Sequence, residues 1–503
     1  MTSPVPSRQN ALKGLRDALA GGYPVIAIET WEEDATLATL NNFFNSAFQG
    51  RGVFQTWDFQ TGLFDAASRT SEKLSAIEAL DKIQAADKPG FFVFKDVTGL
   101  FANSEVRRRI KNIHYSFRGQ NRFLLLTGSD FIIPPDLRKD ILLISYQLPE
   151  AGEIAAIIDE HLQAATRRGA QVELTPEQID QAVISLKGFT GAEMKYALNK
   201  ICWGRKTIDA EIIPLLHDEK EQLARKDGVL EYVRGSESLA DVGGLENLKD
   251  WLLKRRKLFT PEAAQAGIRP PRGLLMMGIS GCGKSLSVKA ISALWGLPLF
   301  RLDMNKVYSG IYGTPEGTFA RAIKNIEGVA PAILWIDEIE GGISSNTAKD
   351  GSTGSHIFSA FLTWMQEKSS DVFVAATANR IDLLPAEIIR KGRFDQVFFI
   401  DLPNDSEREQ IFKVHLSRRG NKIEEFDLPL LSVATEFWNG AEIEHVVEAA
   451  MIEAFHRGTA MAQDDLYTII RGTVPLSRTM SEQIKFIKGW ASERAISASK
   501  SDR

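Results

Sequence analysis

The sequence predicts an α/β protein with two successive parallel sheets, each followed by a helical segment, and three observations lead to this fold class. Short apolar runs alternate with stretches of helical apolar spacing, which is typical of parallel sheets whose strands are joined by helices. The two halves of the 503-residue chain repeat one order of elements. A glycine-rich stretch, GISGCGKS at 278–285, lies between an apolar run and a helical one.

The first half begins with a helical pattern that ends at Gly21-Gly22. Strand candidates follow at PVIAIET (24–30), GFFVFKDV (90–97) and RFLLLTG (122–128). We therefore expect an α/β domain over 1–150, and further helical patterns predict its helical lid over 151–215. The charged stretch over 216–236 is expected to be a solvated helix or a linker.

The second half repeats this plan, with strand candidates at GLLMMG (273–278), LFRLD (299–303), AILWIDE (332–338), VFVAATAN (372–379) and QVFFIDLP (396–403). These predict a large subdomain over 237–403 and a helical lid over 404–475. Residues 476–503 are expected to form a helix and a solvated, mildly basic tail. The Gly/Ser/Thr-rich stretch 341–355 predicts a mobile loop.

Three matches between the halves occur in register. FKDV stands where WIDE stands, and LLLTGSDFIIPPDLRKDILLISYQLPE runs parallel to VAATANRIDLLPAEIIRKGRFDQVFFIDLPN. GFTGAEM at 188–194 runs parallel to FWNGAEI at 437–443. The shared order favours an internal duplication over two unrelated α/β domains.

The composition limits the location and partners of the chain. Its net charge of −5 gives no global basic character, so a nucleic-acid partner is not expected. No apolar run reaches the length needed to span a bilayer, and the N-terminus lacks the apolar region of a signal peptide. The two cysteines, Cys202 and Cys282, lack zinc spacing and favour a reducing, cytoplasmic location.

The stretch GISGCGKS fits the pattern of a phosphate-binding loop. Its glycines allow backbone N–H groups to surround a phosphate, and the next helix adds its positive N-terminus. Lys284 is expected to reach the β- and γ-phosphates of a nucleotide, and Ser285 to ligate Mg²⁺. The expected nucleotide contacts here are Gly278, Ser280, Gly281, Cys282, Gly283, Lys284, Ser285 and Leu286. The thiol of Cys282 either fills a small position or makes binding sensitive to oxidation.

Polar side chains end the next two strands. Asp337 and Glu338 close AILWIDE, at the sheet edge where α/β proteins bind ligands. Asp337 is expected to hold Mg²⁺ through water, and Glu338 to orient the attacking water. Asn379 closes the following strand and is expected to hold that water or the γ-phosphate, unless it is only a strand-end turn.

Two arginines, Arg390 and Arg393, flank a glycine in RKGRFD. A guanidinium supplied to the γ-phosphate of a neighbouring subunit stabilises the charge of the transition state. The alternative is a pair of ordinary surface arginines.

In order and spacing, LADVGGLENLKDWL (239–252), the phosphate-binding loop, WIDE, ATAN, RKGRFD and NGAE resemble the AAA ATPase family. The loop and WIDE correspond to its Walker A and Walker B motifs. The resemblance covers about 235–475 and implies a P-loop NTPase (AAA+) sheet with a helical lid, ATP and Mg²⁺ as cofactors, and a homo-oligomeric ring, usually a hexamer. It also implies that Asp241 and Gly243 border the adenine, that Gly440 and Ala441 lie where the lid meets the nucleotide, and that Arg390 and Arg393 are arginine fingers.

The whole chain resembles a narrower group, the poorly characterised AAA proteins of cyanobacteria and algal plastids. The features that carry this resemblance are an N-terminal half that is AAA-like but degenerate, the tract ARKDGVLEYV, and the ending VPLSRTMSEQIKFIKGWASERA.

The first half of the chain lacks the residues that are expected to bind and hydrolyse a nucleotide in the second half. After PVIAIET the chain reads WEEDATLATL, whose carboxylates would repel a triphosphate and which has no glycine or lysine. Asp96 is expected to match Asp337, while Val97 replaces the glutamate, and Arg138 remains without its Gly-Arg-Phe-Asp. We therefore predict no nucleotide binding in 1–215 and a structural or partner-docking role for this half.

The function implied is Mg-dependent ATP hydrolysis in a ring, coupled to remodelling or unfolding of an unidentified protein partner. Ile311, Tyr312 and Gly313 are expected to form a pore loop, although the aromatic residue is shifted by one position from the family pattern, and Tyr308 and Tyr312 could instead pack locally. A nucleotide-gated regulatory scaffold is one alternative, and a nucleic-acid motor is the second.

Overall fold

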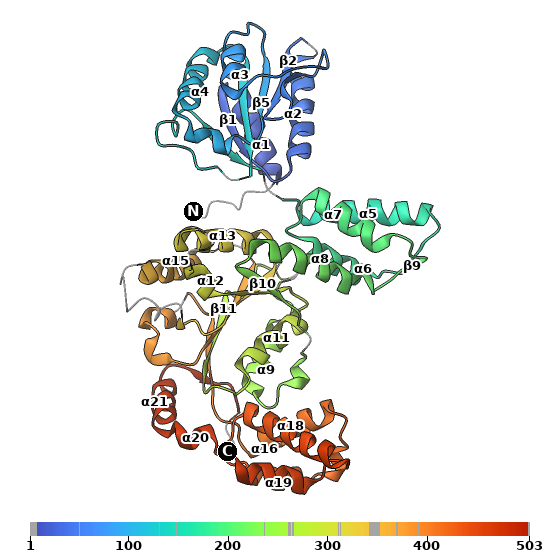
Figure 1. The fold of residues 1–503 in the computed structure, drawn as a ribbon, viewed down its shortest axis with the longest axis vertical. Coiled ribbons are helices and arrows are strands. Elements are labelled where there is room, and N and C mark those ends of the chain that lie inside the picture. The colour runs from blue at the N-terminus through green and yellow to red at the C-terminus, as the bar shows by residue number, and fades with distance from the viewer. Residues whose placement is uncertain are drawn as a thin grey trace. The chain divides into compact units, whose positions relative to one another are not determined.

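The structure is a computed structural model that describes residues 8–49, 51–129, 131–146, 148–235, 237–259, 263, 266–309, 311, 313–341, 353–368, 371–390 and 392–500. Its internal contacts divide the chain into two compact units, each described here by itself (Figure 1). Unit 1 comprises Met1–Glu173 and Leu186–Ile208, and unit 2 comprises Leu174–Ser185 and Asp209–Arg503.

Unit 1 is built on a seven-stranded sheet of order β4-β3-β2-β5-β6-β1-β7. The strands are β1 (Val25–Glu29), β2 (Val53–Asp58), β3 (Gly62–Asp65), β4 (Thr70–Glu72), β5 (Gly90–Phe94), β6 (Arg122–Gly128) and β7 (Leu142–Ser145). The central strands are parallel, and β5 and β6 are buried along their whole length, as near-continuous apolar runs require. The predicted parallel α/β fold is therefore confirmed for this unit.

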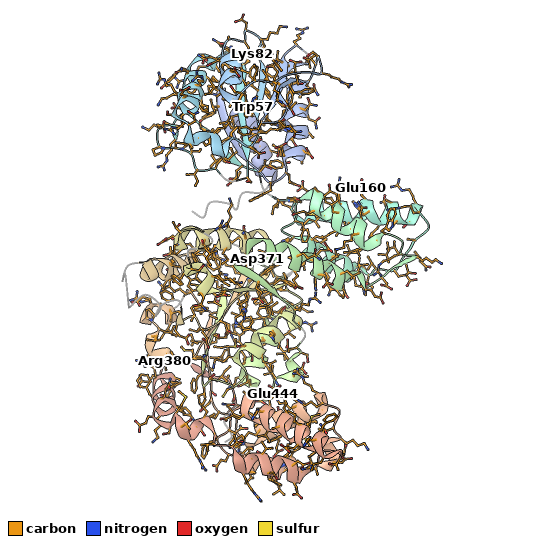
Figure 2. The ribbon with its side chains drawn as sticks, viewed as in Figure 1. Trp57, Lys82, Glu160, Asp371, Arg380 and Glu444 are labelled. Atoms are coloured by element: carbon orange, nitrogen blue, oxygen red, sulfur yellow. The ribbon has the colours of Figure 1, made fainter. Side chains whose placement is uncertain are left out.

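Helices cover both faces of this sheet (Figure 1). They are α1 (Arg8–Ala20), α2 (Glu33–Phe48), α3 (Ala76–Gln84) and α4 (Ser104–Phe117). Trp57, labelled in Figure 2, is buried beneath α3 and stacks on Phe94 with ring centroids 5.1 Å apart. The helices α5 (Ala151–Arg167) and α7 (Gly191–Cys202) contact each other, and β8 (Gln171–Val172) pairs with β9 (Thr207–Ile208).

Unit 2 has a second seven-stranded sheet, of order β10-β12-β13-β14-β11-β15-β16. Its strands are β10 (Leu230–Val233), β11 (Gly273–Gly278), β12 (Leu299–Leu302), β13 (Ala332–Ile336), β14 (Val372–Ala378), β15 (Gln396–Ile400) and β16 (Ile496–Ser497). The strands β13-β14-β11-β15 repeat the order and parallel direction of β5-β6-β1-β7 in unit 1. The shared order supports the duplication.

The helices of unit 2 lie in two layers around its sheet and in a separate bundle. Figure 1 shows α9 (Glu246–Arg255) and α11 (Lys284–Trp295) on one face, with α12 (Met304–Tyr308), α13 (Pro315–Gly328) and α15 (Thr353–Glu367) on the other. The bundle, here called the lid, has its own apolar core and consists of α16 (Asp405–Arg418), α17 (Leu428–Ala434), α18 (Gly440–Arg457) and α19 (Gln463–Gly472). The other helices are α6 (Pro176–Leu186), α8 (Ile212–Asp227), α20 (Leu476–Thr479) and α21 (Ser481–Ser492).

The stretch 216–236, predicted as a linker or solvated helix, contributes the end of α8 and an edge strand. β10 pairs antiparallel with β12, and α8 contacts β10. Leu230 and Tyr232 alternate inward along this strand, which gives β10 an apolar face against the core. Four alternating residues are too short a pattern to predict a strand, because the partner strand lies about seventy positions later.

The C-terminal tail, predicted to be solvated, also joins the sheet. β16 pairs with β15, and the Ala498 N–H donates to the Phe399 carbonyl at 2.8 Å. The Ala498 carbonyl accepts from the N–H groups of Asn247 and Leu248 at 3.0 and 3.2 Å, which would otherwise be unpaired donors in the first turn of α9. Among the helices that the structure describes, none has the length and apolar character needed to cross a membrane.

Candidate functional site

The loop between β11 and α11 requires glycine at three positions. Gly278, Gly281 and Gly283 have φ values of +149°, +78° and +89°. A Cβ at Gly278 would lie 2.0 Å from the Ile400 carbonyl oxygen, and one at Gly281 would lie 2.8 Å from the side chain of Asn439. The loop therefore approaches its neighbours through bare backbone, which leaves its N–H groups available to an anion at the start of α11.

Lys284 begins α11 and is only 6% exposed. Its Nζ donates to the carbonyl oxygens of Gly278 and Ile279 at 3.0 and 2.7 Å. Burial lowers the pKa of Lys284 to about 8. The ammonium is thus held against the loop by neutral acceptors, which a phosphate oxygen can replace with a stronger, charged one.

The two acids after β13 are fixed by Thr377, a residue that the sequence analysis missed. The Thr377 hydroxyl donates to Asp337 Oδ1 at 2.6 Å and accepts from the Glu338 N–H at 3.0 Å. Ser285 Oγ lies 3.4 Å from the same Asp337 oxygen. Glu338 has a φ of +48°, an uncommon conformation for a residue other than glycine, and Asn379 Nδ2 donates to its Oε1 at 2.7 Å. The structure therefore brings Ser285, Asp337, Glu338 and Asn379 together.

The lid meets the loop at the start of α18. Asn439 caps this helix in a capping box with Glu442, and the Ala441 N–H donates to the Gly281 carbonyl at 3.0 Å. A Cβ at Gly440 would lie 3.2 Å from that same carbonyl oxygen. Gly440 and Ala441 thus lie directly against the phosphate-binding loop, and their expected position beside the nucleotide stays a prediction.

The segment before α9 also contacts the lid. A Cβ at Gly243 would lie 2.7 Å from Ile411 Cγ1, so glycine is needed for this close approach. The carboxylate of Asp241 accepts from Ser238 and pairs with Arg418, whose Nη2 lies 3.0 Å away, and these contacts lower the pKa of Asp241. Both expected residues therefore lie where the lid joins the large subdomain.

The two remaining loop residues differ in exposure. Ser280 is exposed, and Leu286 packs against the core beneath α11. Burial raises the pKa of the Cys282 thiol to about 12, so this thiol stays protonated and weakly nucleophilic near neutral pH. Burial also raises the pKa of the Cys202 thiol.

Arg390 and Arg393 lie at the opposite edge of the sheet. β15 starts at Gln396, which pairs with Leu274, whereas the phosphate-binding loop follows Gly278, which pairs with Ile400. The five residues of β15 span about 16 Å. Arg393 donates to the Glu387 carbonyl, and Arg390 is exposed. The structure does not bring either arginine to the site in the same chain.

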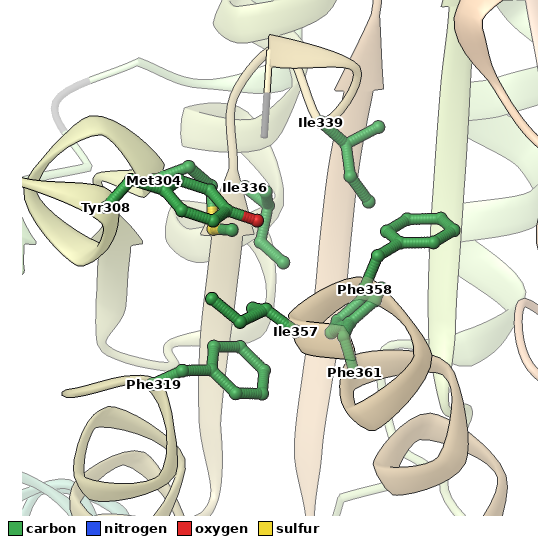
Figure 3. Close-up of a pocket in the computed structure, with 8 residues that line it drawn as sticks. All are labelled: Met304, Tyr308, Phe319, Ile336, Ile339, Ile357, Phe358 and Phe361. Carbon is green, nitrogen blue, oxygen red and sulfur yellow. The ribbon is translucent and has the colours of Figure 1, made fainter. Parts of the chain in front are cut away.

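Of the three pore-loop residues, Ile311 is 80% exposed, Gly313 has a φ of +116°, and Tyr312 lies outside the described residues. The neighbouring Tyr308 points into an apolar pocket (Figure 3), and burial raises its pKa to about 12. The pocket is lined by Met304, Tyr308, Phe319, Ile336, Ile339, Ile357, Phe358 and Phe361.

Strand registers align the degenerate copy with this site. Leu126 of β6 pairs with Phe94 and Ala27, and Ala376 of β14 pairs with Ile336 and Leu275. Phe94 and Ile336 therefore occupy equivalent positions, each at the end of its strand.

This register corrects the expectation that Asp96 matches Asp337. The residue after Phe94 is Lys95, so Lys95 stands at the place of Asp337, and Asp96, with a φ of +50°, stands at the place of Glu338. The comparison of FKDV with WIDE shifted the match by one position because it aligned like charges rather than strand ends. Lys95 pairs with Glu33 at 2.9 Å, so a lysine replaces the carboxylate expected to hold the metal.

The repeated Gly-Ala-Glu phrase has one structural cause in both copies. The glutamates are the third residues of α7 and α18, where they close capping boxes with Thr190 and Asn439. The contacts of the two helix starts differ. In unit 1 the Gly191 N–H donates to the carboxylate of Glu32 at 2.5 Å, whereas in unit 2 α18 contacts a backbone carbonyl of the phosphate-binding loop.

Comparisons with known proteins agree with this geometry. Residues 274–402 match the model of the ATPase family associated with various cellular activities (AAA), and residues 11–146 and 152–227 match the N-terminal and second domains of SpoVK-like AAA ATPases. The chain is 35% identical over 492 residues to the uncharacterized AAA domain-containing protein ycf46 of Trieres chinensis, which covers 96% of this chain and 97% of that one. It is 36% identical over 491 residues to ycf46 of Guillardia theta, covering 96% of each.

A shorter similarity, 29% identity over 287 residues, links 54% of the chain to 70% of the proteasome-activating nucleotidase of Thermococcus onnurineus (strain NA1). The ycf46 matches are different in extent, because they run through both units and nearly the whole length of each protein. The chain therefore belongs to the AAA ATPase family and, within it, groups with the ycf46 AAA proteins of algal plastids.

Proposed function

We propose that unit 2 binds ATP with Mg²⁺ and hydrolyses it within an oligomeric ring, and that turnover remodels or unfolds a protein partner. The observation that carries this proposal is the connected set of hydrogen bonds from Ser285 through Asp337, Thr377 and Glu338 to Asn379, beside the lysine of a phosphate-binding loop. These groups have the types and positions that phosphoryl transfer to water needs.

The side chains at this edge fit Mg²⁺ by donor chemistry. Ser285 and Asp337 offer a hydroxyl and a carboxylate oxygen 3.4 Å apart, and Mg²⁺ prefers oxygen ligands. Within the described residues, no group of three or more His, Cys, Asp or Glu side chains could hold a metal by itself. A magnesium site completed by phosphates and water suits this sparse set, and the ion when bound neutralises phosphate charge.

Each residue then has a role in handling the nucleotide or the attacking water. The loop N–H groups and Lys284 bind the phosphates, and Asp241, Gly243, Gly440 and Ala441 form the boundary with the lid near the base. Glu338 orients and polarises the attacking water. Asn379 fixes the Glu338 carboxylate through its amide, so that the carboxylate does not have to be ordered during the reaction.

Nucleotide affinity is expected to fall as the pH rises above about 8, because burial lowers the pKa of Lys284 to about 8 and the ammonium of the free protein loses its charge above that pH. Phosphate contact favours the charged lysine, so the bound state holds more protons than the free state above this pH, and binding takes up close to one proton per site. Calorimetry at about pH 8.5 in two buffers of different ionisation enthalpy measures this uptake, with near-zero uptake expected at about pH 6.5. Binding without proton uptake at the higher pH would contradict the role of Lys284.

Arg390 and Arg393 support a ring, because a guanidinium at the opposite edge of the sheet can only reach the phosphates of another subunit. Exposed Ile311 supports contact with a polypeptide in the ring pore. The position of the arginines predicts that each ATP site is shared between neighbouring subunits.

Mixing two inactive variants tests this sharing. Arg393→Ala keeps its phosphate-binding loop, and Lys284→Ala keeps its arginines, so each variant alone is expected to be inactive. In an equal, random mixture about a quarter of interfaces pair an intact loop with an intact arginine, and hydrolysis should reappear in proportion. Molar mass from light scattering and ATP turnover should be measured together as the protein concentration rises. Turnover is expected to increase as the ring assembles.

The control for the mixture is Arg494→Ala, which removes an exposed arginine just after α21 whose side chain contacts Trp490 and pairs with Glu493. This variant should hydrolyse ATP normally. If Arg393→Ala is fully active, or if the protein hydrolyses ATP as a monomer, the ring is wrong and a nucleotide-gated regulatory scaffold becomes the better description.

A further inference from the structure

We propose that Glu340 is a positioning residue for ATP hydrolysis, because its carboxylate fixes the backbone of Asn379 and thereby sets the Asn379 amide against Glu338. This inference rests on the proposed function and names a residue that the AAA-like motifs of the sequence did not single out. Glu340 lies two residues after Glu338 in the same turn.

The contacts of Glu340 are with backbone rather than with a cation. Its Oε1 accepts from the Asn379 N–H at 2.7 Å and from the Arg380 N–H at 2.9 Å. The side chain is only 5% exposed. Burying a carboxylate costs free energy because the charge loses its hydration. The burial of Glu340 therefore points to a specific role for its carboxylate.

These contacts link Glu340, Asn379 and Glu338 in one closed set of interactions. Asn379 Nδ2 donates to Glu338 Oε1 at 2.7 Å, while the Asn379 backbone is held by Glu340 from the same turn as Glu338. The Glu340 contacts therefore oppose a shift of the strand end after β14 relative to the turn after β13, and such a shift would displace the Asn379 amide from Glu338.

The turn itself is anchored on both sides of Glu338. The Glu338 and Ile339 N–H groups donate to the hydroxyl and carbonyl oxygens of Thr377, each at 3.0 Å. The side chain of Ile339 is buried in the apolar pocket of Figure 3. The backbone of the turn is thus held without Glu340, so loss of the Glu340 carboxylate should disturb Asn379 more than the fold.

The second oxygen of the Glu340 carboxylate makes no hydrogen bond to a described residue that would fix it elsewhere. Oε2 is buried and has no hydrogen-bond partner among the described residues, and no described cation forms an ion pair with Glu340. Among the described residues, the Glu340 carboxylate is therefore held through Oε1 alone, by the two N–H groups at the end of β14.

Three full-length proteins separate positioning from a merely structural role. Glu340→Ala removes both acceptor contacts, and we expect kcat to fall about 10- to 100-fold while the KM for ATP changes less than about threefold. Glu340→Gln keeps an acceptor oxygen for both N–H groups, so most of the lost kcat should return. Glu425→Ala, which removes an exposed carboxylate in the lid, should match the wild type.

Each outcome bears on the proposal. Wild-type kcat in Glu340→Ala overturns the role of Glu340. Equal losses of kcat, affinity and melting temperature in Glu340→Ala and Glu340→Gln also overturn it, because they show a structural carboxylate. If Glu340→Ala does not fold, Glu340→Gln decides the outcome. A kcat near the wild-type value supports positioning through the acceptor oxygen, and a joint loss of kcat, affinity and melting temperature overturns it. If the wild-type protein binds ATP but does not hydrolyse it, the proposed function itself is wrong. ATP turnover by the wild type, measured first, therefore separates a failure of the proposed function from a failure of the role of Glu340.

Discussion

Replacing Lys284 by alanine is expected to abolish nucleotide binding by the entire chain. The substitution removes a buried ammonium that donates to the carbonyl oxygens of Gly278 and Ile279. Lys284 is the first residue of α11, so no other lysine occupies this position. Losing one partner of a buried, charge-assisted contact weakens binding by about 100-fold or more. Calorimetry or a fluorescent nucleotide should show one site per wild-type chain and none in the variant.

The expected stoichiometry of one depends on unit 1 binding no nucleotide, which we propose from the contacts of its equivalent residues. Lys95 replaces the metal-holding carboxylate and pairs with Glu33. The carboxylate of Glu32 contacts the start of α7, at a position equivalent to the loop–lid contact of unit 2. A phosphate placed there would meet negative charge at short range.

Lys95→Ala is the control, because it removes a lysine from unit 1, at the strand end that corresponds to Asp337, and should leave nucleotide binding unchanged. Two nucleotides per wild-type chain, or saturable binding retained by Lys284→Ala, would contradict a nucleotide-free first unit.

Glu338→Gln is expected to lower kcat for ATP hydrolysis by about 100- to 1000-fold with little change in ATP affinity. The amide has the same shape and keeps an oxygen that can accept from Asn379 Nδ2, so the network around it persists. It lacks the negative charge that polarises the attacking water. Steady-state turnover and equilibrium binding, measured on the same preparation, separate the two effects.

The control for this variant is Glu425→Gln. It removes the charge of an exposed carboxylate that pairs with Lys422 and is remote in sequence from the phosphate-binding loop. It should retain wild-type turnover. Normal turnover in Glu338→Gln would show that another group activates water, and the assignment of roles at the end of β13 would have to be abandoned.

The glycines of the phosphate-binding loop could be predicted from sequence because their requirement is local. Positive φ values at Gly281 and Gly283 and the start of α11 depend on a few consecutive residues, and glycine is the residue that accepts such backbone conformations. The buried strands could be predicted for a similar reason, since parallel strands covered on both faces need continuous apolar runs. The same applies to the acids and amide that end β13 and β14, because carboxyl ends of parallel strands share one edge.

Other contacts could not be predicted, because their partners are remote in the chain. Thr377 reads as an ordinary strand residue until β14 pairs with β13 and places its hydroxyl between Asp337 and the Glu338 N–H. Glu340 reads as one more surface charge until the turn buries it under Asn379. Leu230–Val233 and Ile496–Ser497 are too short to show a strand period and become strands only beside β12 and β15.

The sequence by itself determined the two-copy α/β plan, the phosphate-binding loop and the identities of the acids, because these follow from local backbone demands and repeating apolar patterns. Only the tertiary structure decided the register that makes Lys95 equivalent to Asp337, the position of Arg390 and Arg393 at the far edge, and the burial of Glu340. The physical reason is that register and burial are properties of pairs of segments. A side chain becomes a ligand or a positioning group only when a strand from elsewhere in the chain determines which groups surround it.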